Sequence, residues 1–123
     1  MTTQYDICFV TVGDKKTADE ITAGLLNERL AACVSAVPGV QSSYWWKNRM
    51  ETSAETLLII KTRRTLRENV IQFVKSRHPY EVPETIFTGI DGAPADYLDW
   101  IGANTLFTPN IPKDKAPGTK EEI

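Results

Sequence analysis

The feature that most restricts the fold is a β-rich stretch that is too long for its neighbours. If residues Ala31 to Trp46 form one strand, it is twice as long as the preceding β-rich run, Tyr5 to Val12. Roughly 20 Å of a hairpin would then project past the sheet. The projecting part is apolar and contains Val37, Val40, Tyr44, Trp45, Trp46 and Met50. A lone two-stranded ribbon is marginally stable and leaves edge groups unpaired, so we expect further copies of the chain to cover it.

A shorter strand is the alternative interpretation of the same residues. In that case Pro38-Gly39 is a turn that ends the strand, and Tyr44 to Trp46 fold back into the core. The long ribbon predicts a closed homo-oligomer, whereas the short strand gives no reason for association.

The other segments alternate between strand and helix patterns. Tyr5 to Val12 carries apolar residues on both parities, as in a strand covered on both faces or nearly so. Helical spacing of apolar residues begins at Thr17 and recurs between Arg64 and Arg77, where Pro79 must end the second helix. The further elements are the returning hairpin strand at 55–62, an extended run at 84–90 and a short helix at 94–103. This order matches the α+β ferredoxin-like βαββαβ plan plus a short C-terminal helix, with strand three between strands one and two.

Composition and charge exclude several classes of partner. Fourteen Lys and Arg against sixteen Asp and Glu give a net charge of −2, which argues against nucleic acid or an anionic membrane as a partner. No apolar run reaches the roughly 18 residues of a membrane span, and the first residues lack a signal-peptide pattern, so we expect a cytoplasmic location. Cys8 and Cys33 would lie on non-adjacent strands about 10 Å apart, too far for a disulfide, so we expect two free thiols.

Several stretches together resemble the CutA family, the divalent-cation-tolerance proteins. They are LAACVSAVPGVQSSYWW at 30–46, ETLLIIKT at 55–62, RHPYEVPETI at 77–86 and YLDWI at 97–101. The resemblance implies a ferredoxin-like domain over residues 1–107. The residues after Phe107 lie outside the resemblance, and their polar, proline-punctuated composition predicts a frayed tail at 108–123. The resemblance also implies a tight homotrimer built by pairing of the long hairpin between subunits, similar to the PII signalling proteins. The family is linked by name to divalent-metal tolerance and has no established reaction.

The resemblance indicates where a ligand would bind. The residues in family-like motifs, expected to line a cleft between subunits, are Trp46, Glu55, Lys61, His78, Tyr80, Glu84, Tyr97 and Trp100. Glu55 and Lys61 are six positions apart and so share one face of a strand. Apolar walls with charges of both signs suit a small anionic or zwitterionic ligand. Simpler roles for these residues are strand-end solvation for the charged pair and burial in the core or at an interface for the tryptophans.

His78 is the only histidine, so any imidazole metal ligand must be this residue. Copper favours thiolate and imidazole donors, which are Cys8, Cys33 and His78 in this chain. In family members discussed as copper binders, the suggested ligands are a cysteine just before the strand-one threonine and a double histidine before the proline. This sequence has Val10 and Arg77 at those places. The hypothesis of a bound divalent cation such as copper therefore depends on His78.

The sequence argues against two other function classes, RNA-recognition modules and hydrolases. RNA-recognition modules share the βαββαβ plan, but ETLLIIKT at 55–62 lacks their aromatic motif and the charge balance is acidic. Hydrolase and phosphate-binding motifs do not occur. We therefore expect a trimeric small-ligand or divalent-cation binding protein implicated in metal ion tolerance, not an enzyme. The alternative is an enzyme acting on a small metabolite, with His78 and either Glu84 or Glu55 as an acid/base pair assembled between subunits.

Overall fold

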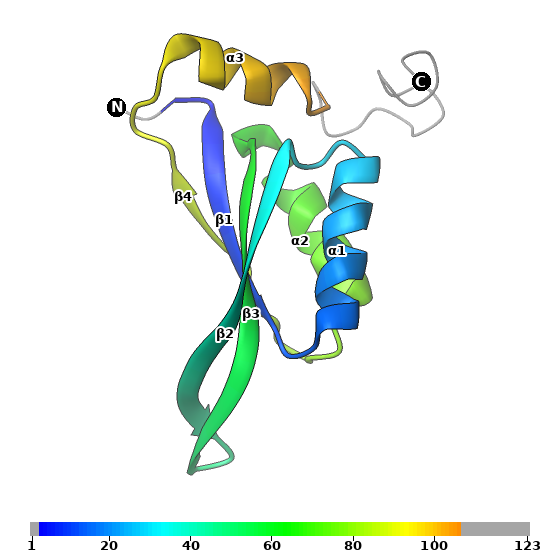
Figure 1. Cartoon of the computed structure of the whole chain (residues 1–123), viewed down its shortest axis with the longest axis vertical. Helices are drawn as coiled ribbons and strands as arrows, with labels where there is room; N and C mark the ends of the chain where they lie inside the picture. Colours follow the sequence, from blue (N-terminus) through cyan, green and yellow to red (C-terminus); the bar gives the residue numbers. More distant parts are fainter. Residues whose placement is uncertain (1–2, 107–123) are drawn as a thin grey trace.

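A computed structural model describes residues 3–106 of the chain (Figure 1). The elements in chain order are β1 (Tyr5–Val12), α1 (Lys15–Asn27), β2 (Cys33–Trp46), β3 (Arg49–Arg63), a 3-10 turn (Arg64–Leu66), α2 (Arg67–Arg77), β4 (Ile86–Gly89) and α3 (Ala95–Ala103). The tail predicted at 108–123 lies outside the described residues, and so does the last residue of the predicted domain.

The four strands form one antiparallel sheet in the order β2-β3-β1-β4. Strand β3 therefore lies between β1 and β2, and the predicted α+β ferredoxin-like plan is confirmed. The register pairs Tyr5 with Arg63 at one end of β1 and Val12 with Thr56 at the other. Residues of β3 before Thr56 consequently have no partner in β1 and pair with β2 alone.

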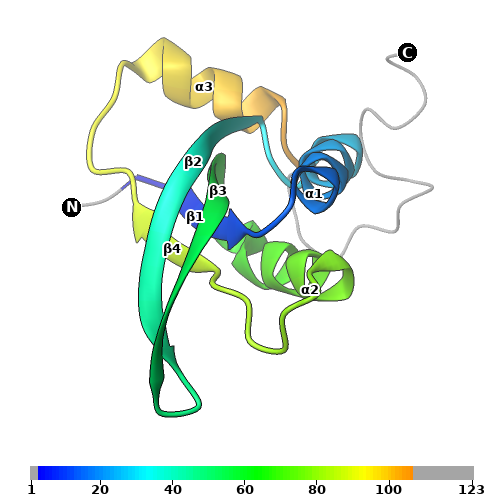
Figure 2. The ribbon, with the colours of Figure 1, turned by 60° about the horizontal axis from the view of Figure 1, so that its bottom comes forward.

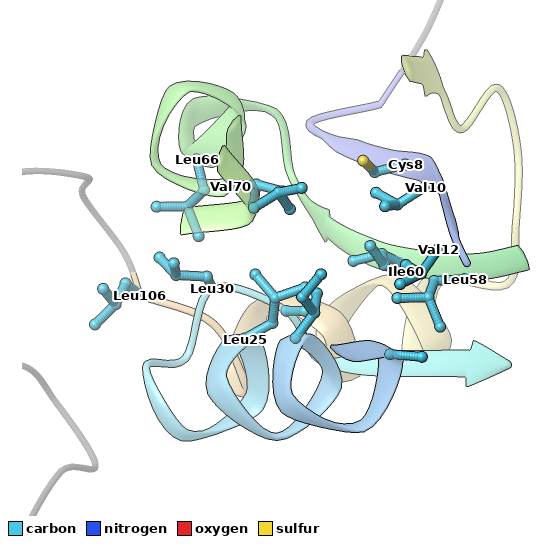
Figure 3. Packing of buried hydrophobic residues seen from close by; sticks show 14 residues of the cluster. Cys8, Val10, Val12, Leu25, Leu30, Leu58, Ile60, Leu66, Val70 and Leu106 are labelled. Carbon is cyan, nitrogen blue, oxygen red and sulfur yellow. The ribbon is translucent and has the colours of Figure 1, made fainter. Parts of the chain in front are cut away.

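Helices α1 and α2 cover one face of this sheet (Figure 2). Helix α1 begins two residues earlier than the apolar spacing predicts, because the Asp14 carboxylate caps it by accepting a hydrogen bond from Thr17 N–H. Helix α2 ends at Arg77, and His78 is extended, as its position before proline predicts. Even-numbered residues of β1 and β3 pack against both helices to form the core (Figure 3); among them are Cys8, Val10, Val12, Leu58 and Ile60.

The long hairpin projects beyond the helices, as Figure 1 shows. Strand β2 continues through Pro38-Gly39, where its pairing with β3 shifts register between Val37 and Val40. The alternative with a turn at this point is therefore wrong. A bulge accommodates the extra residues, and Gly39 takes a left-handed φ of 76° there. At the tip, Lys47 and Asn48 both have positive φ, the conformation of a tight two-residue hairpin turn.

Much apolar surface remains uncovered in the single chain. The odd-numbered residues of β1, and those of β3 from Leu57 onward, are only half-buried; Phe9, Leu57 and Ile59 are among them. The expectation that the first strand is covered on both faces therefore holds for one face alone. On the ribbon, Trp45 is 71% exposed and Trp46 is 53% exposed. These tryptophans are therefore not part of this chain's core.

Two further sequence expectations concern cysteines and membranes. Cys8 is buried, Cys33 is half-buried, and both are free thiols, as predicted. No helix in the described part of the chain has the length and apolarity that crossing a membrane requires.

Candidate functional site

A cavity of about 740 Å³ lies where the projecting ribbon meets the segment between α2 and β4. We call this cavity the hairpin cleft. Ser42, Ser43, Tyr44, Trp46 and Glu55 of the ribbon line one wall, and Pro79, Tyr80, Glu81, Val82 and Glu84 line the other, with Thr11 beside them. Its volume is within the range of small-molecule sites in proteins.

The best-defined contact of the hairpin cleft joins Tyr80 to Glu55. Glu55 comes just before the part of β3 that pairs with β1, and its side chain is nearly buried. The Tyr80 hydroxyl donates a 2.8 Å hydrogen bond to the Glu55 carboxylate. Burial, and then this bond, raise the pKa of Tyr80 to about 12, so the phenol keeps its proton at neutral pH. Gly13 permits the approach, since a Cβ there would lie 2.9 Å from the Tyr80 hydroxyl.

His78 holds the Tyr80 segment in place. Its Nε2 donates to the carbonyl oxygen of Thr11 at 2.8 Å, and its Nδ1 accepts from the backbone N–H of Tyr80 at 3.2 Å. The two rings also lie 4.5 Å apart between centroids. Both imidazole nitrogens therefore have protein partners, and a metal ion or a proton acceptor role would have to displace one of them.

The charge of the hairpin cleft has one sign. Glu55, Glu81 and Glu84 line it, and no Lys, Arg or His in the described part of the chain does. Among residues 3–106, no three His, Cys, Asp or Glu side chains gather closely enough to hold a metal ion. A single chain thus presents several carboxylates around a large space, which is not the compact ligand set of a metal centre.

The structure brings together only part of the predicted site. Four of the predicted residues line the hairpin cleft: Trp46, Glu55, Tyr80 and Glu84. His78 does not line it, but its ring contacts that of Tyr80. Lys61 is not among the lining residues; it lies on β3 opposite Ile7 and Cys33.

Tyr97 and Trp100 also lie apart from the cleft. They are on α3, where their rings stack at 5.8 Å between centroids. Helix α3 is at the end of the molecule opposite the hairpin tip (Figure 1). Any role of these rings at the cleft would need a second copy of the chain.

Sequence analysis missed several lining residues. The sequence places Tyr44 among the apolar residues of the ribbon, and the predicted site does not include Ser42, Ser43, Thr11 or Glu81. A signal for part of the wall exists, because 42, 44 and 46 alternate along a strand and therefore share one face. The contribution of Thr11 has no such signal, because it depends on how the segment after α2 returns to the end of β1.

Comparison with known proteins gives a consistent result over most of the chain. The sequence model of the family described as "CutA1 divalent ion tolerance protein" matches residues 7–104. A rice protein, "Protein CutA 1, chloroplastic", is 42% identical over 99 residues, which are 80% of this chain and 56% of that protein. "Divalent-cation tolerance protein CutA" of Escherichia coli is 34% identical over 98 residues, which are 80% of this chain and 88% of that protein.

Solved structures agree in fold. The crystal structure of CutA1 from Oryza sativa superposes with a TM-score of 0.84 at 40% identity, covering 87% of this chain and 98% of that one. The chain spans about half the length of the curated plant relatives that it matches.

Proposed function

Because the chain belongs to the CutA1 divalent ion tolerance family, we propose that it acts in metal ion tolerance as a homotrimer that binds a small ligand or divalent cation between subunits. The family description names tolerance to divalent ions and no reaction. We further propose that the trimer resembles the PII signalling proteins in using clefts at its subunit boundaries.

The observation that supports this proposal is the position of the hairpin cleft beside a strand edge that has no partner in the described chain. One wall is the ribbon, and β2, its outer strand, is an edge strand of fourteen residues. Long exposed edge strands invite pairing with another chain. A neighbour that paired with this edge would also enclose the cleft.

The uncovered face of the sheet supports the same proposal. Phe9, Leu57 and Ile59 form an apolar surface that neither α1 nor α2 covers. Burying such a surface between copies would stabilise a closed assembly by the hydrophobic effect. In that assembly Lys61, Tyr97 and Trp100 of one subunit would approach the cleft of the next.

Subunit number and ligand content can be tested together. Native mass spectrometry of protein isolated gently from its source should show three chains and any retained small molecule or metal. A single chain at micromolar concentration would contradict the proposed assembly. Three chains that never retain or bind a small molecule or metal ion would contradict the binding role.

Copper binding has a separate test. For His78 to bind copper, a ring nitrogen must give up its bond to Thr11 or to Tyr80. Titration with copper(II) should then show tight binding that is lost in His78→Ala and kept in Cys33→Ser. Equal binding by wild type and His78→Ala would exclude His78 as the ligand.

Two other expectations stay predictions. Catalysis would need His78 to exchange a proton, and both of its nitrogens already have partners, so the geometry gives the enzyme alternative no support. A cytoplasmic location can be tested by fractionating the source cells.

A further inference from the structure

We propose that Lys61 of the neighbouring subunit completes each hairpin cleft, where its ammonium group pairs with the Glu55 carboxylate. This inference rests on the proposed assembly and narrows it to one charge contact. The same contact would hold the subunits together and give the binding site its positive charge.

The first argument is the burial of Glu55. It is only 7% exposed in the single chain, and a neighbour that encloses the cleft would remove its remaining contact with water. Its hydrogen bond comes from the neutral hydroxyl of Tyr80, and no Lys or Arg among residues 3–106 forms an ion pair with it. A buried carboxylate is costly unless a cation compensates it. Assembly therefore favours an arrangement that brings a cation to Glu55.

The second argument is the position of Lys61 on the sheet face that α1 and α2 leave uncovered (Figure 2). Its register partners are Cys33 on β2 and Ile7 on β1, and Thr88 lies opposite Ile7 on β4. None of these neighbours has a carboxylate, and no Asp or Glu in the described part of the chain pairs with Lys61. If this face is buried between copies, the ammonium group needs a carboxylate from another chain.

The third argument is that Glu55 and Lys61 cannot pair within one chain. They are six positions apart on β3, which is roughly 20 Å along an extended strand. Leu57 and Ile59 lie between them on the same face, so the strand presents a negative end, an apolar middle and a positive end. Copies that meet head to tail bring the positive end of one to the negative end of the next, and such contacts close into rings.

The surroundings of both residues favour this pairing. Glu81 and Glu84 line the cleft together with Glu55, and three carboxylates attract the cation of an approaching chain. Arg63 is on the same face as Lys61, but it donates to the carbonyl oxygen of Gly102 at 2.8 Å and so holds α3 against the sheet. With Lys61 in place, the cleft has charges of both signs, and an anionic or zwitterionic ligand would bind by competing with Glu55 for the ammonium group.

A double-mutant cycle tests this contact. Glu55→Gln can still accept the Tyr80 hydrogen bond, and Lys61→Met keeps the length of the side chain. Assembly is measured by sedimentation velocity at the urea concentration that half-dissociates the wild-type protein. Each single change should raise the chain concentration needed for half-assembly by at least about tenfold. The double variant should assemble no worse than Lys61→Met, and additive losses would overturn the inference.

Two further variants separate the charge contact from general damage. Lys61→Arg keeps the charge and should assemble much better than Lys61→Met. Lys75→Met removes an exposed lysine of α2, so its effect should be small and additive with that of Glu55→Gln. Circular dichroism confirms that each variant is folded. Equal losses in Lys61→Met and Lys75→Met would also overturn the inference.

Direct contact has a separate test. A carbodiimide condenses a carboxylate and an amine into an amide without a spacer, and mass spectrometry of the treated protein should identify an amide between residues 55 and 61. The length of strand between these residues excludes that amide within one chain. An amide from Glu55 to a different lysine would contradict the proposed pairing.

Failure of this inference and failure of the proposed function give different results. If the wild-type protein is a trimer and the cycle is additive, this charge contact is wrong while the proposed assembly stands. If the wild-type protein is a single chain in native mass spectrometry, the proposed assembly fails and this inference fails with it.

Discussion

Asp6 is a fully buried carboxylate that is paired with Arg67. Arg67 Nη2 donates to it at 3.0 Å, Arg67 Nε donates to its other oxygen, and Arg64 Nε lies 3.7 Å away. The bond to Asp6 raises the pKa of Arg67, whose side chain keeps 40% of its surface exposed. Removing Arg67 therefore leaves a charge that is buried, whereas removing Asp6 leaves a charge that water can reach.

We expect Arg67→Met to destabilise the protein by about 3–5 kcal/mol, because it leaves the Asp6 charge buried with weaker compensation. Asp6→Asn should cost less, since Arg67 can reach water. Urea denaturation monitored by circular dichroism measures both. Lys16→Met, which breaks an exposed pair with Glu20, should leave stability nearly unchanged. Equal costs for Arg67→Met and Lys16→Met would contradict the role of Asp6.

The Cys8 thiol should be inert in the folded protein. Burial, with the Asp6 and Glu84 carboxylates adding to it, raises the pKa of Cys8 to about 12 from an ordinary value of 9.0. The reactive thiolate is therefore scarce below that pH. In a Cys33→Ser background, we expect iodoacetamide to label Cys8 at pH 8 only after denaturant is added. Rapid labelling of the native protein, followed by mass spectrometry, would contradict this prediction.

Tyr80 should titrate at unusually high pH. Its pKa of about 12 exceeds the ordinary 10.0, so its contribution to stability is complete below pH 10 and is lost as the pH rises through about 12. Removing the charge of Glu55 by Glu55→Gln should lower the Tyr80 pKa, while burial keeps it above 10. Ultraviolet titration of tyrosinate, with Tyr80→Phe to assign the signal, measures this shift.

At the scale of elements, the bulge in β2 depends on one backbone conformation. Gly39 has a φ of 76°, and a Cβ added there would meet no atom within 4 Å. Gly39→Ala should therefore cost about 1–2 kcal/mol through backbone strain alone. Gly92 is equally open but has no such φ, so Gly92→Ala should be neutral or stabilise by up to about 1 kcal/mol. Thermal unfolding of the two variants makes a matched comparison.

The elements show what the sequence could and could not predict. The end of α2 before Pro79 follows from a local rule. The central position of β3 follows from the match of the element order to the βαββαβ plan, and the structure confirms both. Whether β2 continues through Pro38-Gly39 could not be decided from the sequence, because a turn and a bulge use the same residue types. At the candidate site, Trp46, Glu55, Tyr80 and Glu84 were predicted as neighbours. Lys61 was predicted with them because it shares a strand face with Glu55. A shared face does not specify how far apart two side chains lie along the strand, and Lys61 lies outside the cleft of the single chain.

For the whole molecule, the proposed assembly makes the uncovered face of the sheet the surface through which chains associate. Ile59 is half-buried at the middle of this face, paired across the sheet with Phe9 and Ser35. Ile59→Lys should lower the mass measured by light scattering from that of a trimer toward 13.8 kDa, because a charge cannot be buried there unpaired. Gln72→Lys, on the exposed side of α2, should keep the wild-type mass. A trimeric Ile59→Lys would show that this face lies outside the interface.

The projecting ribbon also has a kinetic consequence. Residues 49–55 pair only with β2, and Trp45, Trp46 and Met50 at the end of the ribbon are exposed in the single chain. In the proposed assembly they stay in water until another copy covers them. The core around α1 and α2 can form within one chain, but covering the ribbon in this assembly requires a collision between chains. Recovery from denaturant should then end in a second-order phase, whose half-time shortens as protein is concentrated. Dilution would prolong the time during which unassembled chains expose their ribbons and can aggregate. The same exposure would last longer in cells that make this protein slowly.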